Sequence, residues 1–174
     1  MTAAGLKFPD NSTLRDLGFL VVLSATLEQT MALLYCMVLD EDAAEYEHYL
    51  SGPSRVTVAG RRAVDQLRAD GHDDLATELS EWNEACEEAR QQRHRMVHSI
   101  PYASGADGAF FRWWHPKSGD VEKFDGVVAL IMHSSFVECL LEGRALGDRI
   151  HDRVCSAKQH LPPLAGPAGV DSDS

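Results

Sequence analysis

Apolar residues are spread over most faces of the segment from residue 14 to residue 39, which is rich in Leu, Val and Met. This pattern predicts one long helix, with Ser12 or Thr13 as its N-terminal cap. A helix that is apolar all round must be covered all round. In a small domain, we therefore expect this helix to pack both against its own bundle and against a partner subunit.

A transmembrane span is the alternative for the same segment, because its length and apolar content suit one. Charged and polar side chains interrupt it, namely Arg15, Asp16, Glu28 and Gln29. A central charge in a bilayer costs roughly 2–3 kcal/mol or more. The residues before this segment also lack the basic and apolar regions of a signal peptide. The pattern therefore favours a core or interface helix in a cytoplasmic protein that does not enter a membrane.

Helical spacing of apolar positions recurs along the rest of the chain. The further predicted helices run over residues 40–50, 57–70, 73–99 and 121–159. Acidic residues in the first turn, Asp40 to Asp42, favour the start of the second helix. The sequence Ser51-Gly52-Pro53-Ser54 predicts a break in the chain. Pro101 ends the fourth helix, because proline cannot continue one.

Residues 100–120 differ from the rest, since glycines punctuate a dense aromatic patch. Its aromatic members are Tyr102, Phe110, Phe111, Trp113 and Trp114. This composition predicts a short β-hairpin or an ordered loop packed on the bundle. The predicted fold class is all-α, a bundle of four to five helices with this one insertion. We expect a flexible arm over residues 1–12, a single domain over 13–160 and a disordered Pro/Gly/Ser-rich tail over 161–174.

The chain of 174 residues is acidic, with a formal net charge of −11. Phosphate affinity comes mainly from Lys and Arg, so this balance argues against broad coating of a nucleic acid, although it leaves room for a local phosphate site. The four cysteines, Cys36, Cys86, Cys139 and Cys155, lie far apart and form no CxxC pair. We interpret them as reduced and mostly buried, which suits a cytosolic protein.

The end of the fourth predicted helix gathers three arginines and two histidines: Arg90, Arg93, His94, Arg95 and His98. On a helix, Arg93 and His98 are separated by roughly 140° of rotation and about 7.5 Å of rise. The long arginine still allows both to reach one phosphate, and a two-fold partner would supply a second copy of the pair. An arginine fork binds phosphate oxygens, and a histidine moves protons near neutral pH. The pair suits RNA cleavage by attack of the ribose 2′-OH, without a metal ion or other cofactor.

The run Arg93-His94-Arg95-Met96-Val97-His98 resembles the signature of the HEPN superfamily, an arginine and a histidine separated by four to six residues near a helix end, here by four. The SIPY sequence and the FRWW patch that follow are also similar to the segment after this motif in HEPN-like helical proteins. The resemblance implies a helical bundle that is commonly a homodimer, with the motifs near the interface. In active members it implies a metal-independent endoribonuclease, of the kind found in toxins and defence effectors.

Carried onto this sequence, the resemblance implies that Arg93 holds phosphate, His98 acts as acid or base, and His94 is a polar helper. Arg90, Arg95 and Tyr102 are the accompanying candidates for substrate binding. The partners that follow are a second copy, RNA, and a protein such as an antitoxin or regulator. The main alternative is a HEPN-like interaction module without catalytic activity.

Simpler interpretations remain for the same residues. Cations in a last helical turn stabilise it by roughly 0.3–1 kcal/mol each, and on this interpretation the arginines only balance Glu84, Glu87 and Glu88. His94 and His98 also have the spacing of two metal ligands, and His48 or His133 would complete a site in a metal-binding bundle. The neighbouring arginines argue against a dication there.

The aromatic patch likewise has two interpretations. Phe110 to Trp114 are able to stack RNA bases, with charge from Arg112 and Lys117. We favour a lid that packs on the bundle, with Tyr102 near the Arg93–His98 pair.

Overall fold

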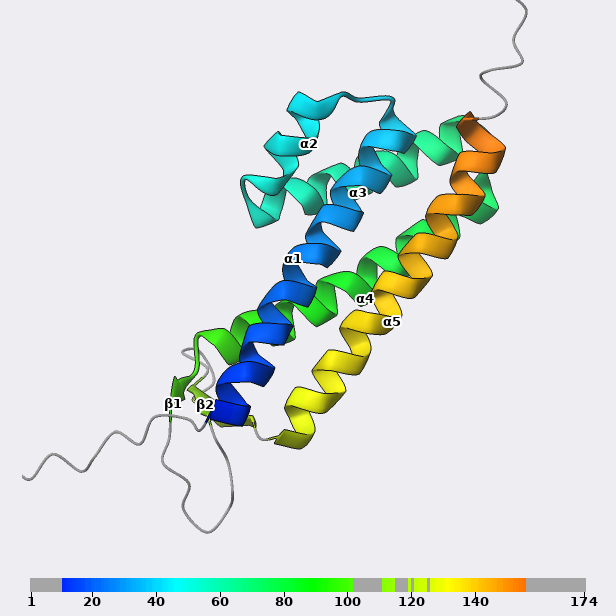
Figure 1. Cartoon of the computed structure of the whole chain (residues 1–174). Helices are drawn as coiled ribbons and strands as arrows, with labels where there is room; N and C mark the ends of the chain where they lie inside the picture. The colour runs from blue at the N-terminus through cyan, green and yellow to red at the C-terminus, as the bar shows by residue number, and fades with distance from the viewer. Residues whose placement is uncertain (1–10, 102–110, 115–118, 120, 125, 156–174) are drawn as a thin grey trace, which may run out of the picture.

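The computed structural model describes residues 11–101, 111–114, 119, 121–124 and 126–155. Within them the chain forms five α-helices and a small antiparallel sheet (Figure 1). The helices are α1 (Asn11–Leu39), α2 (Ala43–Leu50), α3 (Pro53–Ala69), α4 (Asp73–Val97) and α5 (Gly126–Ile150), followed by a π-helical turn at His151–Cys155. The predicted all-α class with one short insertion is confirmed. The proposed arm and tail lie almost entirely outside the described residues.

Helices α1, α3, α4 and α5 form the bundle, and the short α2 packs on α1 and α3. α1 and α5 run side by side in the same direction, and α4 returns between them on the far side (Figure 1). The core is made of side chains from all these helices and includes Leu27, Tyr35, Leu79 and Phe136, all at most 1% exposed. The predicted burial of free cysteines is confirmed for Cys36, Cys86 and Cys139.

The insertion is a three-stranded antiparallel sheet with the order β1 (Ile100–Pro101), β2 (Phe111–Trp114) and β3 (Val121–Phe124). Its β2–β3 register pairs Phe111 with Phe124 and Trp114 with Val121. The hairpin prediction is confirmed, but the prediction that a helix begins at Val121 is wrong. The backbone groups of residues 121–124 pair with β2, so α5 starts at Gly126.

The two turns around α2 also differ from the sequence prediction. Asp40 has a positive φ of 56° and closes α1, with the Glu41 N–H bonded to the Cys36 carbonyl at 3.0 Å. Asp42 then caps α2, because its carboxylate accepts from the Ala44 N–H at 2.8 Å. The predicted start of this helix at Asp40 is therefore wrong by three residues.

α3 begins at Pro53, four residues before its predicted start. Proline suits the first helical position, where its missing N–H is not needed. The helix ends in a Schellman motif, in which Gly71 takes a φ of 80° and the His72 N–H bonds to the Leu67 carbonyl at 2.8 Å. The break over residues 51–54 is thus only a tight turn between α2 and α3.

Candidate functional site

The arginine–histidine cluster lies in the last three turns of α4, and the helix end is firmly capped. The His98 N–H donates to the His94 carbonyl at 3.1 Å, and Ser99 Oγ donates to the Arg95 carbonyl at 2.7 Å. Met96 is buried and fixes this turn on the core. The helix ends at Val97 with His98 as its cap, two residues before the predicted end.

The two histidines of the motif lie against each other. The ring centroids of His94 and His98 are 4.4 Å apart, with an angle of 55° between the ring planes. Both side chains are exposed. Two imidazoles in contact place a proton acceptor and a proton donor at one point of the surface.

Arg93 points into the protein rather than along the surface with the histidines. It continues the row of Leu79 and Cys86 at seven-residue spacing, which keeps a helical residue within about 20° of one face. Both of those residues are buried. The Arg93 side chain is half-buried, and its Nε is buried without a hydrogen-bond partner in the described part of the chain. A buried donor without a partner is costly unless a ligand or water completes it.

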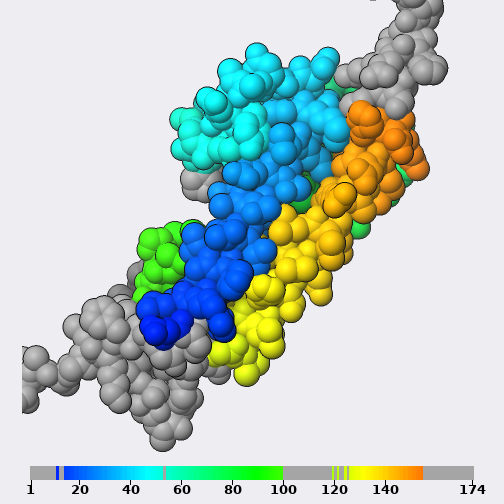
Figure 2. Space-filling model, viewed as in Figure 1, coloured from blue at the N-terminus to red at the C-terminus, as the bar shows by residue number. Residues whose placement is uncertain are grey.

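Arg93 and His94 line a pocket of about 490 Å³, here called the Arg93 pocket. The pocket opens beside α1, between α2 and the end of α4, where Figure 2 shows a notch in the surface. Its lining residues are Ser24, Glu28, Tyr49, Leu50, Ser51, Gly52, Val56, Glu87, Arg90, Gln91, Arg93 and His94. His98 is not among them, but its ring contacts the ring of His94, which does line the pocket. The volume falls in the range of roughly 300–1,000 Å³ that is usual for small-molecule sites.

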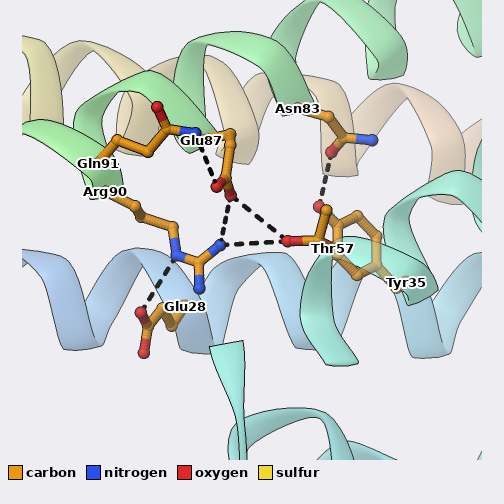
Figure 3. Close-up of polar contacts among 7 residues, drawn as sticks. All are labelled: Glu28, Tyr35, Thr57, Asn83, Glu87, Arg90 and Gln91. Atoms are coloured by element: carbon orange, nitrogen blue, oxygen red, sulfur yellow. Dashed lines mark hydrogen bonds and ion pairs between the residues drawn. The ribbon is translucent and has the colours of Figure 1, made fainter. Parts of the chain in front are cut away.

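Arg90, predicted as a substrate-binding residue, instead forms ion pairs with two carboxylates of the protein itself (Figure 3). Its Nε lies 3.2 Å from Glu28 Oε1, and its Nη1 lies 2.7 Å from Glu87 Oε2. The side chain is only 7% exposed. For Arg90, the simpler interpretation is therefore confirmed for Glu87 of α4, and Glu28 of α1 is a second partner that the sequence did not indicate. The remaining contribution of Arg90 to the pocket is to neutralise Glu28 and Glu87.

A polar network continues from this ion pair across three helices. Thr57 of α3 accepts from Arg90 Nη1 at 3.5 Å, and Gln91 donates to Glu87 at 3.2 Å. Beyond them, Tyr35 donates to Asn83 at 2.6 Å (Figure 3). Burial raises the pKa of the Tyr35 hydroxyl well above its ordinary value, so this donor stays protonated. The network fixes the Arg90 side of the pocket.

The α2 wall of the pocket was missed by reasoning from the sequence. Tyr49 is buried, its hydroxyl donates to the Glu41 carboxylate, and Arg62 Nη1 donates to that hydroxyl at 3.0 Å. Burial first, and then the bond to Glu41, raises the pKa of Tyr49 to about 12. A phenol held in this way is no general base near neutral pH. It serves with Leu50 and Val56 as the apolar wall of the pocket.

The remaining predicted site residues either do not line the Arg93 pocket or lie outside the described residues. Arg95 is half-buried in the last turn of α4 and does not line the pocket. Tyr102, Phe110 and Lys117 lie outside the described residues. Phe111 to Trp114 form β2, whose strand packs against α4, so the patch does border the helix that carries the motif.

The metal-site alternative lacks a complete set of ligands. Among the described residues, no three His, Cys, Asp or Glu side chains are grouped to hold a metal ion. His94 and His98 form a pair. His48 instead has Arg55 Nη1 at 3.3 Å from its Nδ1, and His133 lies in a groove between the starts of α1 and α5.

Comparison of the chain with protein-family models, with curated proteins and with solved structures gives no match in any of the three.

Proposed function

We propose that this chain is a HEPN-like protein that binds single-stranded RNA at the Arg93 pocket and cleaves it without a metal ion. The observation that carries the proposal is Arg93, which lines the pocket together with His94 and whose Nε is buried without a hydrogen-bond partner among the described residues. A phosphate would complete that donor, because a guanidinium binds phosphate oxygens in a fork. Two imidazoles in contact would then stand beside the bound phosphate.

The chemistry follows from these three side chains. A neutral histidine takes the proton of the ribose 2′-OH, and the oxygen attacks the adjacent phosphorus. The other histidine protonates the departing 5′-oxygen, which leaves a 2′,3′-cyclic phosphate. Arg93 stabilises the negative charge that grows on the phosphoryl oxygens. We assign the main acid–base role to His98 and the supporting role to His94.

Cleavage in EDTA is the direct test. The wild-type chain is expected to cut a fluorogenic single-stranded RNA in EDTA and to leave the same sequence intact when each ribose is 2′-O-methylated. Arg93→Gln should abolish this cleavage, because the phosphate loses its fork. If the protein binds the RNA but never cuts it, the non-catalytic module is the better description. Cutting of the methylated strand would contradict the 2′-OH mechanism.

We also propose that the protein is a homodimer joined through the exposed apolar face of α1 and α5. Nine large side chains form this α1/α5 apolar face: Leu14, Phe19, Val21, Val22, Leu33, Val127, Leu130, Ile131 and Leu141. Each of the nine is between 43% and 66% exposed, and a partner in a standard-size complex buries about 800 Å². A large exposed apolar face, when its residues gather on neighbouring helices, is typical of an interaction site.

A second copy fits this face better than a lipid bilayer does. α1 and α5 are each long and apolar enough to cross a membrane by length and composition. They run in the same direction, however, and the helix that returns between them and packs on both is α4 (Figure 1). α4 carries acidic and basic residues along its whole length, and Arg90 ties it to Glu28 of α1. Insertion of this bundle would place those charges in hydrocarbon.

Light scattering in solution checks the dimer. We expect a mass of twice 19.2 kDa for the wild type and of 19.2 kDa for Val22→Asp, which buries a carboxylate in the interface. Val58→Asp is the matched control, because Val58 is similarly exposed, at 54% against 62% for Val22, but lies on α3. Monomeric wild-type protein at micromolar concentration would contradict the dimer and leave the RNA site to a single chain.

A further inference from the structure

A second arginine lies beside the turn between α2 and α3 that forms part of the Arg93 pocket. Ser51 and Gly52 line the pocket, and Arg55, which is not a lining residue itself, has its side chain next to both of them. A Cβ built on Gly52 would lie 3.8 Å from Arg55 Cδ, and Arg55 Nη1 donates to Ser51 Oγ. Arg55 therefore stands at the rim of the pocket, on a part of the chain remote in sequence from Arg93.

Two neighbours hold Arg55 in place through one of its nitrogens only. Its Nη1 contacts Ser51 Oγ and lies 3.3 Å from His48 Nδ1. A guanidinium can only donate, so His48 Nδ1 accepts and its proton is on Nε2. Ser51 Oγ in turn donates to the His48 carbonyl at 2.7 Å. In the described residues the Nε and Nη2 of Arg55 have no partner, and these two atoms form one side of an arginine fork.

Among the described residues, the carboxylates of the pocket are paired with an arginine, whereas two arginines at or near the pocket have no carboxylate partner. Glu28 and Glu87 are both paired with Arg90. Neither Arg55 nor Arg93 has a carboxylate within ion-pair distance in the described part of the chain. Glu45 and Glu47 are exposed on α2 near His48, but they do not line the pocket. Among the described residues of a protein with a net charge of −11, two arginines without a carboxylate partner thus serve the pocket, Arg93 in its lining and Arg55 beside its rim.

We propose that the Arg93 pocket binds one nucleotide of an RNA strand with a phosphate at each end, the second of them on Arg55. This inference rests on the proposed function and adds a second phosphate subsite to it. Arg93 and His94 hold the phosphate that reacts, and the Nε/Nη2 side of Arg55 holds the neighbouring phosphate. Tyr49, Leu50 and Val56 supply the apolar surface between them for the sugar or base. The volume of about 490 Å³ suits one nucleotide and excludes a duplex.

Binding of small nucleotides tests the subsite without any cleavage. Uridine 3′-phosphate carries one phosphate and uridine 3′,5′-bisphosphate carries two, and neither contains a bond that the enzyme would cut. By calorimetry, the wild type is expected to bind the bisphosphate about ten-fold more tightly, the effect of one added charge-assisted bond. Arg55→Gln should remove this gain and leave the affinity for the monophosphate unchanged. Arg93→Gln should weaken both.

Two further variants separate charge, fork geometry and fold. Arg55→Lys keeps the charge but not the fork, so it should retain only part of the gain. Arg144→Gln is the matched control, because Arg144 is exposed on α5 and away from the pocket, and it should change nothing. The wild-type comparison of the two nucleotides needs no variant and stands even if Arg55→Gln unfolds.

The outcomes also distinguish this subsite from the function on which it rests. Equal affinity of the wild type for both nucleotides, or a full gain in folded Arg55→Gln, would overturn the second subsite. RNA cleavage in EDTA that depends on Arg93 would in that case still support the proposed function. If neither nucleotide binds, the subsite is overturned as well, and the cleavage assay alone decides the function.

Discussion

A His98→Ala variant is expected to cleave RNA about 10² to 10⁴ times more slowly than the wild type, the usual contribution of a general acid or base. The loss should appear in the single-turnover rate at saturating RNA, whereas RNA affinity should change little. His98 is exposed, and it caps α4 through its backbone N–H rather than its side chain. The variant should therefore unfold at the wild-type temperature, and lost activity cannot be ascribed to lost structure.

The other histidine of the pair gives the matched comparison. His94 lies between the Arg93 pocket and His98, so we expect it to position the phosphate and the partner ring. His94→Asn keeps a polar side chain and should retain more activity than His94→Ala. His72→Ala, at the other end of the same helix, should keep full activity, because His72 forms no side-chain capping bond.

The dependence of the cleavage rate on pH distinguishes a His98 that transfers protons from a His98 that only supports the structure. A reaction with one histidine base and one histidine acid has a bell-shaped profile, and removal of one of them removes one limb. A merely structural His98 would lower the rate equally at every pH. Unchanged cleavage in folded His98→Ala would reject the assignment of His98 outright.

The fold class and the long helices were predictable because periodicity is a local property. Leu75, Leu79, Trp82 and Cys86 recur at helical spacing and are all buried in α4. The start of α5 was not predictable in this way. Residues 121–124 alternate little in type, with Val121 and Phe124 flanking Glu122 and Lys123, and this short pattern suits the start of a helix as well as a strand. Their pairing with β2 decides between the two.

The candidate site was predictable only along α4. The cluster itself is visible in the sequence, and so is the i,i+3 pair of Glu87 and Arg90. Glu28 of α1, which also pairs with Arg90, is 62 residues away and follows only from helix packing. Tyr49 and the turn of Ser51 and Gly52 line the same pocket as Arg93 for the same reason. The seven-residue row of Leu79, Cys86 and Arg93 was the one local signal that Arg93 faces inward.

Gly143→Ala is expected to lower the free energy of unfolding by about 1–3 kcal/mol, the usual cost of overpacking a filled core. α5 passes so close to Trp82 at this residue that an added Cβ would overlap the indole Cζ2 and lie 2.9 Å from Cε2. The indole has no room to yield. It is 4% exposed, and its Nε1 donates to the Cys139 carbonyl at 2.8 Å. Denaturant unfolding at fixed protein concentration measures the loss, since a dimer makes stability depend on concentration.

The same substitution one helical turn later should have the opposite sign. Within the described part of the chain, a Cβ at Gly147 would meet only Leu34 Cδ1, at an ordinary 4.0 Å. Gly147→Ala then gains the helix propensity of alanine, roughly 0.5–1 kcal/mol, without a clash. A double-mutant cycle identifies the cause, because Trp82→Leu makes room for the new methyl group. Gly143→Ala should cost much less in the Trp82→Leu background than in the wild type. Equal costs in the two backgrounds would mean that the indole does not set the separation of α4 and α5.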